Sequence, residues 1–86
     1  MNIKYLVTTK EWRDKINGNT YFASQIENLE NGTIKKIPFQ YGYGTHSEYV
    51  AKEFLNLKGF NSDLPIRFVK IPNCKQREVK DFGGEY

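Results

Sequence analysis

Two Asn-Gly dipeptides limit the fold of this 86-residue chain more than any other feature. Asn17-Gly18 and Asn31-Gly32 each lie between segments rich in β-branched and aromatic residues. Asn-Gly is the strongest short signal for a two-residue β-hairpin, because both central positions of a type I′ turn need positive φ. The sequence therefore predicts an antiparallel sheet that contains at least two hairpins.

The first strand is predicted from Ile3–Thr9, which is β-branched and aromatic. The following segment, Lys10–Ile16, has two interpretations. Thr8 and Glu11 have the spacing of a helical capping box, which would favour a short helix. Pairing across Asn17-Gly18 would instead make the segment a strand. We favour the extended interpretation.

In the second hairpin, a two-residue turn at Asn31-Gly32 would place Leu29 opposite Ile34. That register predicts one apolar face of the sheet, formed by Phe22, Ile26, Ile37, Phe39 and Tyr41. The opposite face would carry the polar residues Gln25, Glu27, Lys36 and Gln40. A sheet of this kind needs a cover on its apolar face only.

A helix over Thr45–Lys58 is the predicted cover. Thr45 and Glu48 have capping-box spacing, and Gly59 would end the helix. An apolar stripe at helical spacing is formed by Val50, Ala51, Phe54, Leu55 and Leu57.

Two further strands are predicted, Ile66–Ile71 and the short Glu78–Phe82. The whole pattern predicts an α+β fold, an antiparallel β-sheet of four to five strands with one main α-helix packed on one face, in a single domain spanning 1–86.

Composition excludes several classes of site. Cys74 is the only cysteine and His46 the only histidine, so we expect no internal disulfide, no metal and no cofactor. No apolar run approaches the roughly 20 residues of a membrane span, so we expect a cytoplasmic protein without membrane contact. The net charge of +3 permits an anionic partner without requiring one.

The glycine–tyrosine segment before the predicted helix is a candidate anion-binding loop. Backbone N–H groups at Gly42, Gly44, Thr45 and His46 could face an anion near the positive end of the helix dipole. The alternative is a strand-to-helix turn that needs positive φ at both glycines. His46 is followed directly by Ser47 and Glu48, and adjacent helical residues point in different directions, so we expect no catalysis.

Two other groups of residues are binding candidates. Trp12 and Arg13 beside the first hairpin tip, with Tyr43 and Tyr49, are predicted protein contacts, since Trp, Tyr and Arg are enriched in interface hot spots. The alternative for Trp12 is that its ring packs back onto the protein. A basic set in the last third would face phosphates or form an ordinary solvated surface: Arg67, Lys70, Lys75, Arg77 and Lys80.

Three motifs in the first half of the chain resemble a family of small uncharacterised tailed-phage proteins: Trp12-Arg13-Asp14-Lys15, Asn17-Gly18-Asn19-Thr20-Tyr21-Phe22 and Pro38-Phe39-Gln40-Tyr41-Gly42-Tyr43-Gly44. The resemblance implies a phage or prophage origin and no particular chemistry. Many phage proteins of this size block a host complex, anti-CRISPR inhibitors among them. We therefore expect a non-enzymatic protein that binds a host protein or nucleoprotein complex in the host cytoplasm. The alternative is a nucleic-acid-binding domain that uses the basic C-terminal residues.

Overall fold

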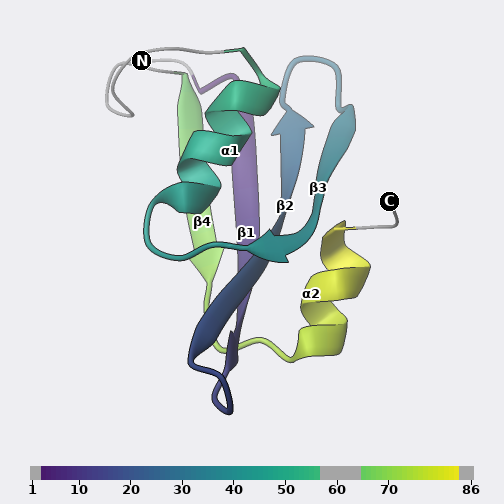
Figure 1. The fold of residues 1–86 in the computed structure, drawn as a ribbon. Helices are drawn as coiled ribbons and strands as arrows, with labels where there is room; N and C mark the ends of the chain where they lie inside the picture. Colours follow the sequence, from purple (N-terminus) through teal and green to yellow (C-terminus); the bar gives the residue numbers. More distant parts are fainter. Residues whose placement is uncertain (1–2, 57–64, 84–86) are drawn as a thin grey trace.

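The computed structural model describes residues 3–56 and 65–83. In that part of the chain, four strands form one sheet in the order β3-β2-β1-β4, and two helices pack on it (Figure 1). The elements are β1 (Tyr5–Asp14), β2 (Asn19–Asn28), β3 (Ile34–Tyr41), α1 (His46–Phe54), β4 (Ile66–Ile71) and α2 (Gln76–Gly83). The α+β fold is confirmed. The sheet is mixed, because β4 pairs with β1 in parallel, while β1 with β2 and β2 with β3 are antiparallel.

The first hairpin shows that the segment after Thr9 is extended, as we favoured, but its turn is longer than predicted. Asp14 pairs with Asn19, which leaves a four-residue loop. The glycine that ends this loop donates its N–H to the Asp14 carbonyl over 2.7 Å and has a φ of 73°. The second loop repeats this geometry, with Gly32 donating to the Asn28 carbonyl over 2.7 Å and a φ of 74°. Neither loop asparagine has positive φ, so the predicted type I′ turns were wrong.

The longer loops shift both hairpin registers by two residues. Ile34 pairs with Glu27 and not with Leu29. Ile16 lies in the first loop, where its side chain is 94% exposed. The sequence located both turns correctly, but the predicted pairing of the strands was wrong.

A β-bulge in β3 decides on which face its aromatic residues lie. Phe22 pairs with Gln40, and between this pair and the next, β3 has two residues, Pro38 and Phe39, where β2 has one. The extra residue turns Phe39 and Tyr41 to the face opposite Phe22. The prediction that these aromatic residues share one face was therefore wrong, and Gln40 lies on the face of Phe22.

Helix α1 covers the face that carries the main core, and in Figure 1 it crosses in front of β1 and β4. Ala51 is fully buried there, and Val50 and Leu55 pack against the same cluster. Phe54 is 49% exposed, so its predicted place in the stripe was wrong. The buried residues of the cluster are Val7, Phe22, Ile26, Ile37, Ala51 and Ile66.

The ends of α1 differ from the prediction. Thr45 precedes the helix, but its side chain makes no capping hydrogen bond. The helix ends at Phe54 because Asn56 takes the left-handed conformation, with a φ of 55°, that commonly terminates helices. The predicted continuation through Leu57, Lys58 and Gly59 lies outside the described residues.

Helix α2 occupies the segment that the sequence predicted as a strand, so that prediction was wrong. Val79 is fully buried, and the Gln25 side-chain amide donates to the Phe82 carbonyl over 2.9 Å. Gly83 lies so close to β2 that a Cβ there would be 2.7 Å from the Cβ of Ala23. Successive residues of a strand point to opposite faces, so α2 packs on the face opposite α1.

Candidate partner-binding surface

Aromatic side chains from three strands and the following loop form a continuous aromatic row. Trp12 stacks on Tyr21 with ring centroids 5.5 Å apart, and Phe39 stacks on Tyr21 at 5.1 Å. Tyr41 meets Tyr21 edge-on at 5.8 Å and Tyr43 at 6.2 Å. The register explains this arrangement, because Trp12 pairs with Tyr21 and Tyr21 with Tyr41 across neighbouring strands. These contacts connect Trp12 and Tyr43, two predicted partner contacts, through Tyr21 and Tyr41, which the sequence analysis did not name as binding residues.

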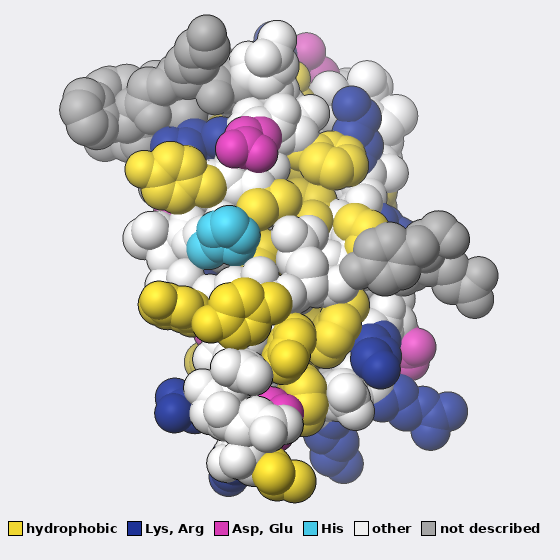
Figure 2. Space-filling model, viewed as in Figure 1, with side chains coloured by type: hydrophobic (Ala, Val, Ile, Leu, Met, Phe, Trp, Pro, Cys, Tyr) yellow, Lys and Arg dark blue, Asp and Glu magenta, His cyan; other side chains and the backbone are white. Residues whose placement is uncertain are grey.

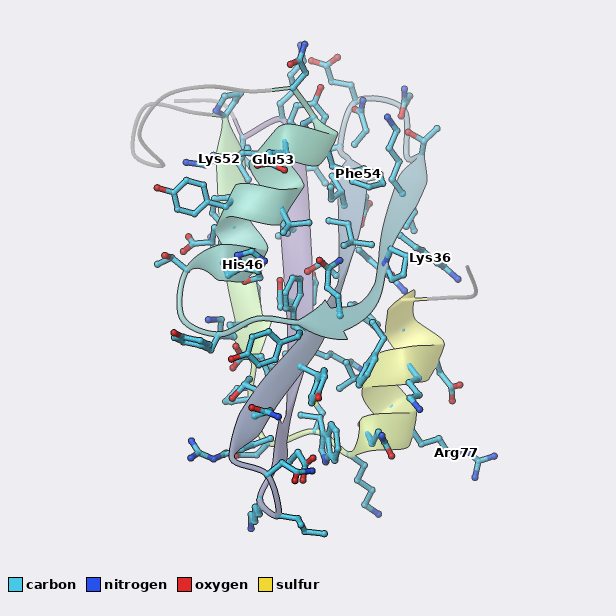
Figure 3. All side chains as sticks on the ribbon, viewed as in Figure 1. Lys36, His46, Lys52, Glu53, Phe54 and Arg77 are labelled. Atoms are coloured by element: carbon cyan, nitrogen blue, oxygen red, sulfur yellow. The ribbon has the colours of Figure 1, made fainter. Side chains whose placement is uncertain are left out.

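The aromatic row ends at a hollow of about 350 Å³ beside α1, which we call the tyrosine pocket. Its tyrosines are well exposed, Tyr41 by 53%, Tyr43 by 67% and Tyr49 by 61%. Figure 2 shows hydrophobic side chains on either side of the single histidine, and Figure 3 places His46 at the start of α1. The lining residues are Tyr41, Gly42, Tyr43, Thr45, His46 and Tyr49.

The two glycines of the pocket have different roles. Gly44 has a φ of 63° and turns the chain into α1, as predicted. Gly42 does not have positive φ, so that part of the prediction was wrong. Gly42 is needed for close approach instead. A Cβ there would overlap the His46 ring and lie 2.7 Å from Cε1 of Phe22, whose ring meets the His46 ring edge-on at 5.9 Å.

The same loop has few free donors for the predicted anion. The His46 N–H donates to the Tyr43 carbonyl over 3.2 Å, and the Glu48 N–H to the Thr45 carbonyl over 3.0 Å. Glu48 also places a carboxylate in the first turn of α1. The anion site stays a prediction.

Trp12 and Arg13, which we predicted as protein contacts beside the first hairpin tip, do not share one surface. They are adjacent in β1, so their side chains leave the sheet on opposite faces. The Trp12 ring is half-buried within the aromatic row, and Arg13 is exposed. The alternative interpretation, that the Trp12 ring packs back onto the protein, agrees with its position. The ring lies on the α2 face of the sheet and outside the main core.

The basic residues of the last third are not gathered in one patch. Arg67 and Lys70 lie three positions apart in β4 and so face opposite sides. Lys70 Nζ is 3.3 Å from Glu11 Oε2 and donates to the Gly44 carbonyl over 2.7 Å. Lys80 Nζ lies 5.3 Å from the centroid of the Phe39 ring. Lys75 and Arg77 are exposed near the start of α2, and Arg77 projects away from the sheet in Figure 3.

The sequence analysis missed a second hollow, of about 420 Å³, between the β1–β2 hairpin and the segment that joins β4 to α2. The Cys74 N–H donates to the Glu11 carbonyl over 2.9 Å and holds that segment against β1. We call this hollow the basic groove. Its lining includes Trp12, Arg13, Asp14, Lys15 and Lys75.

The described part of the chain contains no group of three or more His, Cys, Asp and Glu side chains placed to hold a metal ion. Neither α1 nor α2 has the length and apolar character needed to cross a membrane.

Fold and surface together define a small α+β domain, with one mixed sheet between two helices and an exposed tyrosine pocket. No protein-family model matches the chain, and neither a curated protein nor a solved structure matches it.

Proposed function

We propose that this chain is a non-enzymatic binding protein that contacts a host protein or nucleoprotein complex through the tyrosine pocket, as an inhibitor of the anti-defence or anti-CRISPR type. The observation that carries the proposal is the gathering of three exposed tyrosines around one hollow. Exposed rings at a concave site are a common sign of an interface. A phage origin and a location in the host cytoplasm rest on the resemblance of the first half of the chain to tailed-phage proteins.

The contacts of the tyrosines support a role in binding because they hold the rings before a partner arrives. Tyr43 rests edge-on against Tyr41 at 6.2 Å, and Lys52 Nζ lies 5.1 Å from the centroid of the Tyr49 ring. A side chain that is already ordered loses less conformational entropy when a partner binds. The hollow would then receive one anchoring side chain of the partner.

Capture from a host lysate, with and without nuclease, tests the proposal and shows whether the partner is a protein or a nucleic acid. Tyr43→Ala and Tyr49→Ala should leave the thermal midpoint almost unchanged, since both side chains are exposed. Each should weaken partner binding at least tenfold, which is about 1.4 kcal/mol. The control is Ile34→Ala, which removes a side chain that is 54% exposed on β3 and outside the pocket.

Two outcomes would contradict the proposal. If both tyrosine variants unfold, the tyrosines stabilise the monomer and are not a free surface. If both variants fold and still capture the partner like the control, the contact lies elsewhere on the molecule.

Direct binding of nucleic acid by the basic C-terminal residues is the second candidate function. We rank it lower because Arg67 and Lys70 face opposite sides of the sheet and Glu11 pairs with Lys70. Charge reversal at Arg67, Lys70 and Arg77 should abolish binding if this candidate is correct, and the affinity should then fall steeply with salt.

A further inference from the structure

Three cations surround the basic groove without forming ion pairs. Arg13 and Lys15 come from the end of β1 and its loop, and Lys75 directly precedes α2. All three are exposed, and none makes an ion pair with another described residue. Because like charges repel, cations brought together at one hollow favour an anionic ligand.

The one acidic residue of the groove, Asp14, is committed to the hairpin loop. Its carboxylate accepts hydrogen bonds from the Ile16 N–H at 3.0 Å and from the Asn17 side-chain amide at 2.8 Å. These bonds, with the Asn17 side chain the largest cause, lower the pKa of Asp14 and keep it ionised. Its charge offsets one of the three cations that line the groove. The Glu78 carboxylate, which accepts the Lys75 N–H over 3.4 Å, lies beside the groove and offsets a second, so one positive charge remains in excess.

Trp12 gives the groove an aromatic wall that continues along the sheet. Its ring stacks on Tyr21 at 5.5 Å, and the aromatic row extends from there to the exposed Tyr41. Proteins that bind single-stranded nucleic acid combine a positive groove with aromatic side chains on which bases stack. Trp12 belongs to both the basic groove and the aromatic row, so it brings a positive groove and stacking rings together.

We propose that the basic groove binds single-stranded nucleic acid. Lys15 and Lys75 hold phosphate groups, a base lies against Trp12, and the strand continues toward Tyr41. This inference goes beyond the proposed function, because it assigns a second ligand to residues outside the tyrosine pocket. A nucleoprotein partner that exposes a single strand could occupy both surfaces.

Trp12 is the only tryptophan, so its fluorescence reports on the groove directly. The probe is a single-stranded oligothymidylate of about a dozen nucleotides. Its titration should quench the fluorescence to saturation. The observed affinity should fall with salt with a log–log slope of about −1.4, the value for about two phosphate contacts on a single strand.

A pair of matched double variants localises the contact. Lys15→Ala with Lys75→Ala should weaken binding at least tenfold. Lys35→Ala with Lys36→Ala removes the same charge from two exposed lysines of β3 outside the groove, and should change the affinity less than about twofold. All four side chains are exposed, so both proteins should fold, as circular dichroism would verify.

The proposal is overturned if the oligothymidylate does not quench Trp12, or if both double variants lose affinity equally. Equally tight binding of thymidine monophosphate would instead indicate a site for a small phosphate compound. Equally tight binding of a duplex of the same length would show that single strands are not preferred. A different result contradicts the proposed function, namely that Tyr43→Ala and Tyr49→Ala fold and still capture the partner from host lysate like the control.

Discussion

Gly42 and Gly44, two positions apart in the same loop, should respond differently to the same substitution. A Cβ at Gly42 meets Phe22, which is fully buried and cannot move without disturbing the core. Gly42→Ala should therefore cost about 2 kcal/mol through overpacking. A Cβ at Gly44 meets open space, so Gly44→Ala should cost only the strain of its positive φ, about 1 kcal/mol.

Thermal denaturation measures this difference, since 1 kcal/mol shifts the midpoint of a domain of this size by roughly 4–8 °C. A Gly42→Ala protein that is as stable as the wild type would show that the His46 and Phe22 rings can move apart at little cost.

Asp14 predicts a dependence of stability on pH. Its pKa in the folded protein is lowered below the ordinary value of 3.8, first by the Asn17 side chain and then by backbone N–H groups. The ionised carboxylate therefore stabilises the fold at pH above 3.8, and this contribution is lost as the pH falls through the lowered folded pKa. Asp14→Ala should be less stable than the wild type at neutral pH, and the difference should shrink in acid.

Urea unfolding at neutral pH and below the folded pKa of Asp14 would check this expectation. A difference that persists unchanged in acid would mean that the neutral carboxyl group holds the loop equally well.

The exposed tyrosines were predictable from local sequence, whereas the basic groove was not. Tyr43 stands between two glycines, and Tyr49 lies on the polar side of a helix, so local patterns indicate exposure for both. Lys15 and Lys75 are far apart in the chain, and only the folded sheet brings them to one hollow. A contact of that kind has no local sequence signal.

At the scale of elements, side chains that precede the loops explain the incorrect hairpin registers. Asp14 and Asn28 each accept a hydrogen bond from the backbone N–H two residues later, at 3.0 Å from Ile16 and 2.9 Å from Glu30. Such bonds stabilise a turn that begins at the Asp or Asn itself and places the Asn-Gly dipeptide at its end. Asp or Asn three residues before Asn-Gly was therefore the signal for the four-residue loop.

Helix α2 was missed because its sequence suits a short strand as well as a helix. Two features favour the helix. Asn73 turns the chain with a φ of 60°, and the Glu78 side chain accepts the Lys75 N–H over 3.4 Å near the helix start. The spacing of Val79 and Phe82 then directs both side chains toward the sheet.

Because α2 is a helix that buries Val79, we expect Val79 to contribute more to stability than Phe54. Val79 is fully buried, so Val79→Ala should destabilise the protein by roughly 2 kcal/mol. Phe54→Ala should cost less than about 1 kcal/mol, because the ring is already 49% exposed. Equilibrium unfolding in urea compares the two variants. A larger loss for Phe54→Ala would show that the end of α1 carries more of the core than its exposure indicates.

At the scale of the whole molecule, the aromatic row connects the two candidate surfaces, the basic groove and the tyrosine pocket. The described chain measures 41 by 24 by 19 Å, and in so thin a domain much of the surface is available to partners. The aromatic row runs from Trp12 at the basic groove to Tyr43 at the tyrosine pocket in steps of 5.5 to 6.2 Å. If both proposals hold, a partner that follows the aromatic row would contact both surfaces at once.

The sheet also couples the two helices, which predicts cooperative unfolding. Phe22 and Ala23 are neighbours in β2, yet one packs in the core under α1 and the other lies under Gly83 of α2. Loss of either helix exposes a face of the same strand, so we expect a single transition. Trp12 fluorescence reports on the face of α2, and far-UV circular dichroism reports on the whole backbone.

The two signals should give the same urea midpoint in the wild type, and both midpoints should fall together in Val79→Ala. If Trp12 fluorescence changed at lower urea than the dichroism in Val79→Ala, α2 would detach as a separate unit. The groove that it borders would then be a mobile site, and its affinity for a single strand would be reduced by the fraction of molecules in which α2 is undocked.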